Sequence, residues 1–327
     1  MKEILNYLFE HKTLSRASAK AILLRVGHGE FSTGEIASFL TVFAMRSLTL
    51  DELSGFRDAM LELCVKVDLS EFDAIDIVGT GGDGKDTFNI STTSAFVVAG
   101  SGVKVSKHGN YGVSSSCGSS NVLEHLGVTF TNEEAKLKQQ LEKAGFCMMH
   151  APLFHPAMKY VAPVRKEMKV RTFFNILGPL INPSFPKKQF LGVYNLEVFR
   201  LYGYLNQGTD VKFSIIHALD GYDEISLTGA TKIVNNQGEY LLSPEQLGFA
   251  KVKPEELYGG ASIEESAKML VAILNNEEQG ARKNVVLANA GLAIATAKDL
   301  SFEEGIAAAK ESIESGNAYK SLKALID

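Results

Sequence analysis

From Ala74 onward, short apolar runs alternate with stretches that are long enough to form helices. The runs are Ala74–Val78, Val103–Ser106, Phe146–Met149, Phe190–Val193 and Phe213–Ala218. Amphipathic stretches fill the intervals and the C-terminal third, namely Asn132–Ala144, Leu196–Asn206, Glu264–Leu274, Ala281–Ala297 and Glu303–Ser315. Such alternation is typical of strands joined by crossover helices. It predicts an α/β fold with a central, mostly parallel sheet flanked by helices.

The first 68 residues have helical patterns throughout. Ser32–Glu35 and Thr49–Glu52 each match a capping box, in which a hydroxyl and a carboxylate satisfy two amides at a helix start. Apolar residues then recur every three or four positions, which predicts one apolar stripe on each helix. The stripes form the core of a small helical bundle, or in addition a subunit interface.

The proline distribution separates two regions of the chain. Six of the eight prolines lie between Pro152 and Pro186, where they repeatedly interrupt regular hydrogen bonding. The 327 residues also exceed the roughly 250–300 at which one hydrophobic core stops growing. We therefore expect a small N-terminal helical domain at 1–68, joined by helical segments near 156–182, and a larger α/β domain at 69–327.

Composition favours small ligands over a polyanion. The net charge is −5, whereas nucleic-acid binders usually present a basic face. No window approaches the roughly 18 apolar residues that span a bilayer, and the N-terminus lacks a signal-peptide pattern, so we expect a cytoplasmic location without membrane contact. Cys64, Cys117 and Cys147 are odd in number and match no metal-binding spacing, as expected of reduced thiols.

A glycine-rich segment follows the first apolar run directly. Gly79, Gly81 and Gly84 formally match the dinucleotide fingerprint, in which backbone amides approach a diphosphate. That fingerprint also requires an immediate helix and an acidic residue about 20 positions later, and both are missing here. A phosphate loop of another kind remains, with a tight glycine-rich turn as the alternative.

Two polar clusters that suit phosphate follow in the same region. Phe88–Thr93 leads into an apolar helical stretch, where hydroxyls and amides at a helix start favour an anion. Plain N-capping by Ser91 or Thr92 is the alternative. Lys107–Asn110 then precedes a run of small hydroxyl residues, Gly112–Ser120, which forms either an anion-binding loop or an ordinary flexible one.

Charged residues farther along complete the candidate site. Arg165 lies ten residues, nearly three helical turns, after His155, so both could face one ligand; a solvated basic face is the alternative. Asp220–Glu224 precedes the strand-like Ile225–Thr228, and its adjacent carboxylates suit Mg²⁺ with substrate phosphate oxygens. A simple Asp-Gly turn would give the same pattern. The sequence shows no triad or HExxH motif that would favour acyl transfer or zinc hydrolysis.

In the order and approximate spacing of its motifs, the chain resembles the anthranilate phosphoribosyltransferases. The motifs are Gly79–Gly84, Asn89–Thr92, Lys107–Asn110, His155–Lys159 with Arg165, Asn175–Leu180 and Asp220–Glu224. The resemblance implies a pentosyl transferase of tryptophan biosynthesis with two Mg²⁺ per active site. It further implies a helical domain through which the protein forms a homodimer, and a cleft that holds anthranilate and phosphoribosyl pyrophosphate.

The resemblance also assigns site residues. It implies phosphoribosyl pyrophosphate binding by Gly79, Gly82, Asp83, Thr87, Asn89, Ile90, Ser91, Thr92, Lys107, His108, Gly109, Asn110, Tyr111, Gly112, Val113, Ser114, Ser115 and Ser119. It implies anthranilate binding by Gly79, His108, Asn110, His155, Arg165 and Pro179, and metal binding by Ser91, Asp223 and Glu224. It assigns an electrostatic role to Asp83, Lys107 and Glu224, and it identifies no residue as catalytic in the strict sense.

Four positions depart from the family pattern. Tyr111 stands where an arginine is usual, Ser116 where a basic residue is usual, and Ser120 and Asn121 where Ala-Asp is usual. The closing loop thus lacks two positive charges. Two rival functions remain at this point: a nucleoside phosphorylase, which would not need the Asp223–Glu224 pair, and a non-catalytic relative that binds nucleic acid, which the net charge disfavours.

Overall fold

The computed structural model describes residues 1–112 and 117–327. These residues form two compact units. The helical unit comprises Met1–Lys66 and Ala151–Pro183, and the sheet unit comprises Val67–His150 and Ser184–Asp327. The chain thus leaves the helical unit, enters the sheet unit, and returns once before it completes the sheet.

The helical unit has an aromatic core to which both of its chain segments contribute. Phe173 stacks on Phe56 with 4.4 Å between the ring centroids, and Phe39 and Phe43 meet both rings edge-on. The proline-rich segment therefore completes the core of the N-terminal helices. The helices are α1 (Lys2–Phe9), α2 (Arg16–Gly27), α3 (Thr33–Met45), α4 (Leu50–Leu63), α8 (Ala151–Phe154), α9 (Ala162–Met168) and α10 (Phe174–Leu177), with 3-10 turns at Pro156–Tyr160 and Gly178–Leu180.

Both predicted capping boxes are confirmed. The Ser32 hydroxyl accepts the Glu35 amide at 3.3 Å, and the Glu35 carboxylate accepts the Ser32 amide at 2.9 Å. Thr49 and Glu52 make the same exchange at 3.2 and 3.0 Å. Local chemistry alone therefore defines where α3 and α4 begin.

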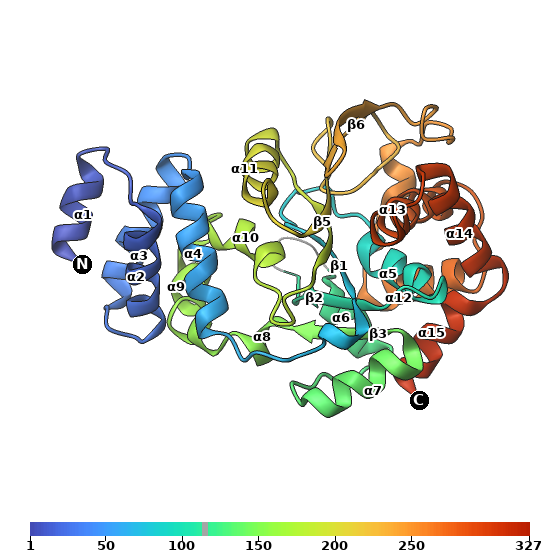
Figure 1. Ribbon diagram of the computed structural model, residues 1–327, viewed down its shortest axis with the longest axis horizontal. Helices are drawn as coiled ribbons and strands as arrows, with labels where there is room; N and C mark the ends of the chain where they lie inside the picture. Colours follow the sequence, from blue (N-terminus) through green and yellow to red (C-terminus); the bar gives the residue numbers. More distant parts are fainter. Residues whose placement is uncertain (113–116) are drawn as a thin grey trace. The chain divides into compact units, whose positions relative to one another are not determined.

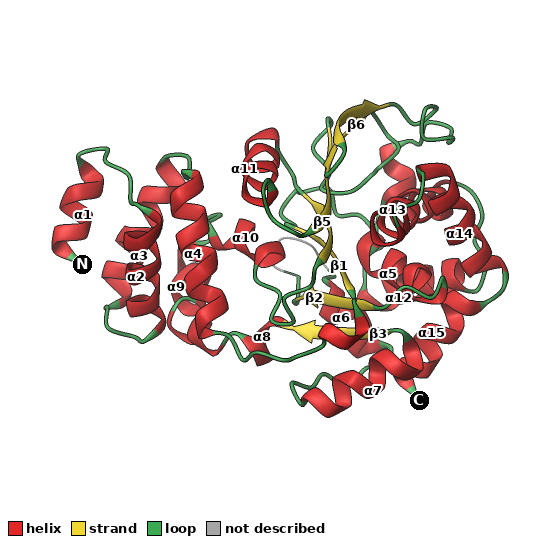
Figure 2. Cartoon of the chain, viewed as in Figure 1, coloured by secondary structure: helices red, strands yellow, loops and turns green. Residues whose placement is uncertain are grey.

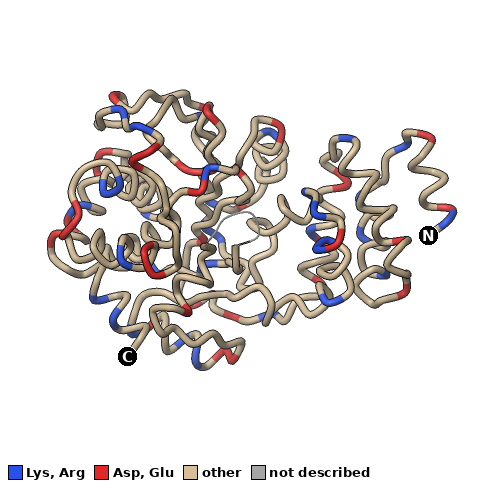
Figure 3. Tube along the Cα trace, turned by 180° about the vertical axis from the view of Figure 1, so that it is seen from behind, with Lys and Arg blue, Asp and Glu red and all other residues tan. Residues whose placement is uncertain are grey.

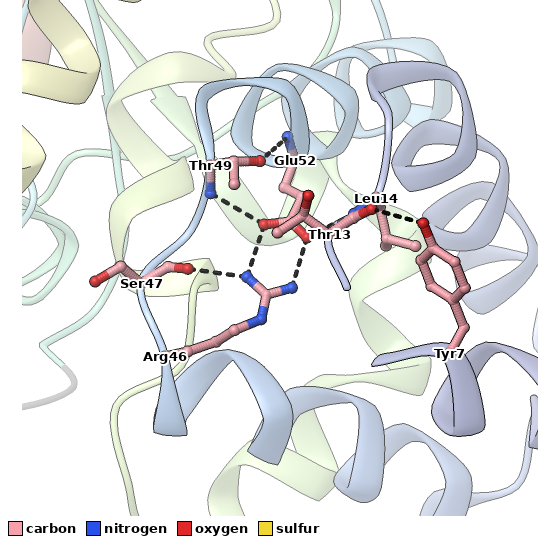
Figure 4. Close-up of polar contacts among 7 residues, drawn as sticks. All are labelled: Tyr7, Thr13, Leu14, Arg46, Ser47, Thr49 and Glu52. Atoms are coloured by element: carbon pink, nitrogen blue, oxygen red, sulfur yellow. Dashed lines mark hydrogen bonds and ion pairs between the residues drawn. The ribbon is translucent and has the colours of Figure 1, made fainter. Parts of the chain in front are cut away.

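Glu52 also joins three separate segments of the helical unit (Figure 4). Its side chain is fully buried and accepts two hydrogen bonds from the Arg46 guanidinium, at 2.6 and 2.9 Å, and one from the Leu14 amide at 2.9 Å. Burial alone would raise the pKa of Glu52, but the hydrogen bonds from Arg46, Thr49 and Leu14 lower it overall. The carboxylate is therefore charged, and its removal would leave several donors unsatisfied.

The sheet unit is built on one sheet whose order, among the described residues, is β3-β2-β1-β4-β5-β6-β7. The first five strands in this order are parallel, and the hairpin β6–β7 is antiparallel. The strands are β1 (Ile75–Gly79), β2 (Val105–Gly109), β3 (Phe146–His150), β4 (Lys188–Gly192), β5 (Lys212–Ala218), β6 (Thr231–Asn235) and β7 (Gly238–Leu242). The predicted fold class, with its mostly parallel sheet, is confirmed.

Helices flank this sheet on both sides (Figures 1 and 2). Figure 1 shows α11 on one side of the strands and α5, α13 and α14 on the other. Burial of the apolar strand residues between these layers forms the main core. The helices of this unit are α5 (Ile90–Gly100), α6 (Ser119–His125), α7 (Glu134–Ala144), α11 (Leu196–Asn206), α12 (Ile263–Leu274), α13 (Ala281–Lys298), α14 (Phe302–Glu314) and α15 (Asn317–Ile326), with 3-10 turns at Ser70–Phe72 and Pro254–Leu257.

One predicted strand is wrong. Ile225–Thr228 has no regular structure, and Leu227 adopts a left-handed backbone with φ of +58°. The Ile225 backbone is bonded on both sides by the Asn289 side chain rather than by a neighbouring strand. Tertiary contact therefore overrides the strand propensity of this apolar segment.

Charged residues of both signs are interspersed along the chain (Figure 3). Exposed ion pairs such as Lys187–Asp210 at 2.8 Å and Lys268–Glu264 at 2.7 Å are screened by solvent and contribute little to stability. In the part of the chain that the structure describes, no single helix is long and apolar enough to cross a membrane, although α13 and α14, bent by 115°, meet the length and composition criteria as a pair.

We expect Glu52→Ala to lower the free energy of unfolding by about 3 kcal/mol, because it leaves a partly buried guanidinium and two backbone amides without their acceptor. Urea denaturation would measure the loss. Glu62→Ala is the control, since Glu62 forms an exposed pair with Lys20 at 2.6 Å and its removal should leave the free energy of unfolding nearly unchanged. Equal effects of the two substitutions would contradict the role given to Glu52.

Candidate functional site

The candidate site lies where the strand order of the sheet reverses direction. β1 is followed in sequence by β2 on one side, while β4 lies on its other side. In open α/β sheets, ligands bind outside the carboxyl ends of the strands at such a point. The last residues of the two strands, Gly79 and Gly192, are register partners, and the Thr80 amide donates to the Gly192 carbonyl at 2.9 Å.

Asp223 packs directly against these strand ends. Its Oδ2 accepts the Gly81 amide at 2.6 Å, across 142 residues of sequence. A Cβ on Gly79 would overlap this carboxylate, and a Cβ on Gly192 would overlap the Asp223 carbonyl oxygen. Close approach therefore requires glycine at both positions, as it does wherever backbone must meet another group without an intervening side chain.

Glu224 contacts the second predicted phosphate segment. Its Oε1 accepts the Ser91 amide at 2.9 Å, within the first turn of α5. The alternative interpretation of this segment, plain N-capping by Ser91 or Thr92, is wrong, because α5 begins at Ile90 and Asn89 is the N-cap residue without a side-chain cap bond. The Glu224 carboxylate takes that place, and the Asn89 amide group instead donates to the Cys117 carbonyl at 3.0 Å.

Lys107 brings a buried cation to the same point. Its side chain is almost fully buried, and Nζ donates to the Ile77 carbonyl and, at 3.3 Å, to the Ser91 hydroxyl. Burial lowers the pKa of Lys107 to about 8, while Asp76, Glu224 and Asp223 oppose the shift. The amine is therefore still mostly protonated at pH 7.

The charged forms of both acids in the pair are disfavoured in the folded protein. Burial, followed by the charge of Asp83, raises the pKa of Asp223 to about 7. Burial, then Asp223 and Asp83, raise the pKa of Glu224 well above its ordinary value. Such shifts from burial and like charges are common where a site is built to receive a cation.

The donor chemistry of this site fits Mg²⁺. Among the described residues, no group of three or more His, Cys, Asp or Glu side chains is arranged to hold a metal. Mg²⁺ is usually bound by one or two carboxylates with substrate phosphate oxygens and water, which matches two neighbouring acids beside amide donors. Within those same residues, buried Thr80 Oγ1 and Asn89 Oδ1 have no hydrogen-bond partner, as expected of atoms aimed at a ligand.

The other predicted phosphate residues lie on the same strand ends and loops. Gly81, Gly82 and Gly84 have φ of +63°, +75° and +73°, so the glycine run combines left-handed turns with the close approach to Asp223. Thr87 pairs with Tyr258, and the His108 amide donates to Asp76 Oδ1 at 3.0 Å. Ser119 Oγ donates to the Asn110 carbonyl at 3.2 Å. The predicted residues Val113, Ser114 and Ser115, and the departure at Ser116, lie outside the described residues.

Three predicted anthranilate residues belong to the helical unit. His155 is buried, Pro179 lies in a 3-10 turn, and Arg165 lies on α9. Arg165 Nη2 donates to Asn175 Oδ1 at 3.3 Å, and its guanidinium lies 5.5 Å from the centroid of the Phe174 ring. The assumed spacing of nearly three helical turns is wrong, because a 3-10 turn at Pro156–Tyr160 separates His155 from α9. That both residues face one ligand stays a prediction.

Several residues that shape the site were missed by the sequence analysis. Gly192 lies within the apolar run Phe190–Val193 that was identified, but its role depends on Asp223, a distant residue. Asn289 Oδ1 accepts the Ile225 amide at 3.0 Å, and its Nδ2 donates to the Ile225 carbonyl at 2.9 Å, which fixes the backbone next to Glu224. A polar residue within the largely apolar α13 was the available signal. Thr80 lies within the glycine motif, but the sequence analysis assigned it no role.

The fold and this site define a glycosyl transferase. The family model "glycosyl transferase family, helical bundle domain" matches residues 2–64, and the model "glycosyl transferase family, a/b domain" matches residues 71–319. An anthranilate phosphoribosyltransferase from Christiangramia forsetii is 56% identical over 325 residues, which cover 99% of this chain and 98% of that protein. One from Bacteroides thetaiotaomicron is 52% identical over 328 residues, which cover 100% of this chain and 99% of that protein.

Solved structures agree. Anthranilate phosphoribosyltransferase from Thermus thermophilus matches with a TM-score of 0.92 and 35% identity, over 98% of each chain. The Saccharomyces cerevisiae enzyme in complex with PRPP and Mg matches with a TM-score of 0.89 and 29% identity, over 96% of this chain and 93% of that one. The chain belongs to the anthranilate phosphoribosyltransferase family, which confirms the resemblance found in its motifs.

We expect the Asp223 carboxyl to destabilise the metal-free protein as pH rises. Its pKa is about 7 in the folded protein and lower when unfolded, so the folded state binds more protons between about pH 4 and 7, and stability falls across that range. Without divalent cations, Asp223→Asn should therefore raise the thermal unfolding midpoint more at pH 8 than at pH 5, by roughly 5 °C.

Calorimetry at the two pH values measures this difference. Glu142→Gln is the control, because Glu142 is exposed, and its midpoint should follow that of the unmodified protein at both pH values. A benefit of Asp223→Asn that is larger at pH 5 than at pH 8 would contradict the assignment.

Proposed function

We propose that this protein transfers the phosphoribosyl group of phosphoribosyl pyrophosphate to the amine of anthranilate, giving N-(5-phosphoribosyl)anthranilate and pyrophosphate. One observation carries the proposal: Asp223 contacts the glycine loop at Gly81, and Glu224 contacts the start of α5 at Ser91. Paired acids and two anion-suited backbone segments thus meet at one strand end. Relatives support the choice of substrates, because yeast structures are described in complex with PRPP and Mg and with 4-fluoroanthranilate.

Phosphoribosyl pyrophosphate would lie along the ends of β1 and β2. The residues proposed to bind it are Gly79, Gly82, Asp83, Thr87, Asn89 to Thr92, Lys107 to Gly112 and Ser119, together with Val113, Ser114 and Ser115. Amides of the glycine loop and of the first turn of α5 favour negative charge, and the protonated Lys107 adds to this effect. These fixed donors would stabilise the leaving diphosphate as the C1–O bond breaks toward an oxocarbenium-like state.

Ser91, Asp223 and Glu224 would hold Mg²⁺, with two ions per site. Bound Mg²⁺ neutralises negative charge that develops on the leaving diphosphate. The chain's own contribution is to keep two carboxylates fixed beside the anion-binding amides. Asp83, whose charge raises the pKa of both acids, would contribute electrostatically to the same charge balance.

The residues proposed to bind anthranilate are Gly79, His108, Asn110, His155, Arg165 and Pro179. Arg165 supplies a planar, always charged fork that suits a carboxylate, and its contacts with Asn175 and Phe174 limit its orientation. An arylamine is already neutral at pH 7, so no strong general base is required. Positioning and diphosphate stabilisation would then supply most of the rate enhancement.

The decisive experiment follows the loss of anthranilate fluorescence on addition of phosphoribosyl pyrophosphate, with Mg²⁺ and with EDTA. We expect turnover with Mg²⁺ and almost none with EDTA. Phosphorolysis of a pyrimidine nucleoside without anthranilate turnover would replace the proposal with the rival phosphorylase function. The homodimer and the cytoplasmic location stay predictions.

Removal of a single acid should be costly. We expect Glu224→Ala and Asp83→Ala each to lower kcat by about 10²–10³, because each removes one electrostatic group from a site that depends on charge. The same fluorescence assay measures both. Glu239→Ala on the edge strand β7 is the control, since its carboxylate is exposed and pairs only with Lys232 among the described residues. Unchanged turnover in both acid variants would overturn the metal assignment.

Gly192→Ala should also abolish most of the activity, because its methyl group would displace the Asp223 backbone and with it both acids. We expect a loss of at least about tenfold in kcat/KM. Gly203→Ala on α11 is the matched control, because a Cβ there meets only the Val234 side chain, at an ordinary 3.8 Å. Comparable activity of the two variants would show that the close approach of Asp223 to β4 is not required.

A further inference from the structure

Asn121 connects two backbone segments that carry proposed substrate residues. Its Oδ1 accepts the Gly112 amide at 2.9 Å and the Gly118 amide at 3.0 Å. A carboxamide oxygen has two lone pairs, so both are used. A Cβ on Gly118 would overlap the Gly112 nitrogen, which shows how closely the two backbones approach.

Asn110 is held by the same helix start. Its carbonyl accepts the Ser120 amide at 3.1 Å and the Ser119 hydroxyl at 3.2 Å. Together with the two bonds of Asn121, these contacts fix Asn110–Gly112 against the first turn of α6. The relative position of Asn110 and Ser119, two proposed substrate residues, is therefore set by α6.

Tyr111 secures this arrangement from its other side. Its hydroxyl donates to Glu124 Oε1 at 3.2 Å, and its ring meets the His150 ring edge-on with 5.0 Å between centroids. His150 in turn stacks on Phe130 at 4.4 Å, and its Nδ1 is 2.8 Å from the Ser120 hydroxyl. We call Tyr111, Ser120, Asn121 and His150 the loop clasp.

The loop clasp is made of neutral groups. Burial lowers the pKa of His150, although Glu124 opposes the shift, so the imidazole is uncharged at pH 7. An Asn oxygen accepts the two amides as a carboxylate would, but it places no negative charge beside residues that would bind a diphosphate.

We propose that Asn121 and Tyr111 are positioning residues that orient Asn110 and Ser119 for phosphoribosyl pyrophosphate, with Asn121 acting through a neutral carboxamide. This inference rests on the proposed function. The two residues act through the backbone they hold and are not assigned contact with the substrate.

Three variants of this pair test the proposal by steady-state kinetics. Asn121→Ala removes the shared acceptor and should raise KM for phosphoribosyl pyrophosphate about tenfold with a smaller effect on kcat. Asn121→Asp keeps the acceptor but adds charge, so its KM should be raised at low salt and approach the unmodified value near 0.5 M salt as the charge is screened. The Asn121→Ala defect should not respond to salt in this way.

The double variant Tyr111→Arg/Asn121→Asp places a positive charge next to Gly112, whose amide bonds residue 121, and should restore at low salt part of what Asn121→Asp alone loses. His125→Ala is the control, because His125 is an exposed residue on the same helix. Thermal unfolding midpoints separate a general loss of folding from a local effect. The hydrogen-exchange rates of the Gly112 and Gly118 amides should increase in Asn121→Ala, because both amides lose their acceptor. This measurement tests the loop clasp without requiring enzyme activity.

These experiments distinguish a failure of the proposed function from a failure of the role given to the loop clasp. If the unmodified protein does not consume anthranilate, the proposed function fails, while amide exchange still tests the clasp. If the unmodified protein is active and Asn121→Ala keeps both its KM and its exchange rates, the clasp is overturned. A double variant no better than Asn121→Asp would overturn the charge argument.

Discussion

The approach of Asp223 to the ends of β1 and β4 is the contact on which the site depends. It joins a loop after β5 to the glycine loop 142 residues earlier, at the point where the strand order reverses. Two glycines make it possible, since side chains at 79 or 192 would occupy the same space. The fold thus supplies an edge where backbone amides from several strands converge, and the missing side chains let an acid enter it. Glu224 then reaches α5 because it is the next residue.

Burial of these acids is unfavourable by itself. Raised pKa values of Asp223 and Glu224 mean that the folded protein holds their charged forms poorly, and Lys107 compensates only in part because its own pKa is lowered by the same burial. Stability is instead provided by other contacts, namely the apolar core of the sheet unit and, within the helical unit, contacts such as the Glu52 network. Charge imbalance confined to one strand end is the usual signature of a functional site rather than of a structural ion pair.

The sequence predicted what is governed by local chemistry. Capping boxes at Ser32 and Thr49, the apolar runs of the five parallel strands and the long amphipathic helices all follow from patterns within a few residues. The start of α5 does not follow from such a local pattern, because its Ser91 amide is bonded by Glu224, which lies 133 residues away. Ile225–Thr228 has the sequence pattern of a strand, but the Asn289 side chain bonds the amide and the carbonyl of Ile225 in place of a neighbouring strand. The hairpin β6–β7 was missed because β7 is largely exposed and lacks an apolar run. The candidate acids and glycines were recognisable by type, whereas the contacts between them were not.

The first turn of α5 explains why acids and an anionic substrate can share one site. Its amides and the positive end of the helix dipole attract negative charge, and in the structure the Ser91 amide is bonded to Glu224. A diphosphate at the same helix start would meet the same donors, so carboxylates and substrate would compete and repel each other. Bound Mg²⁺ would offset this repulsion, because it attracts both carboxylates and phosphate oxygens. Asp223 and Glu224, which bond the glycine loop and the start of α5 in the structure, would then hold the metal together with substrate oxygens, and metal binding would be coupled to substrate binding.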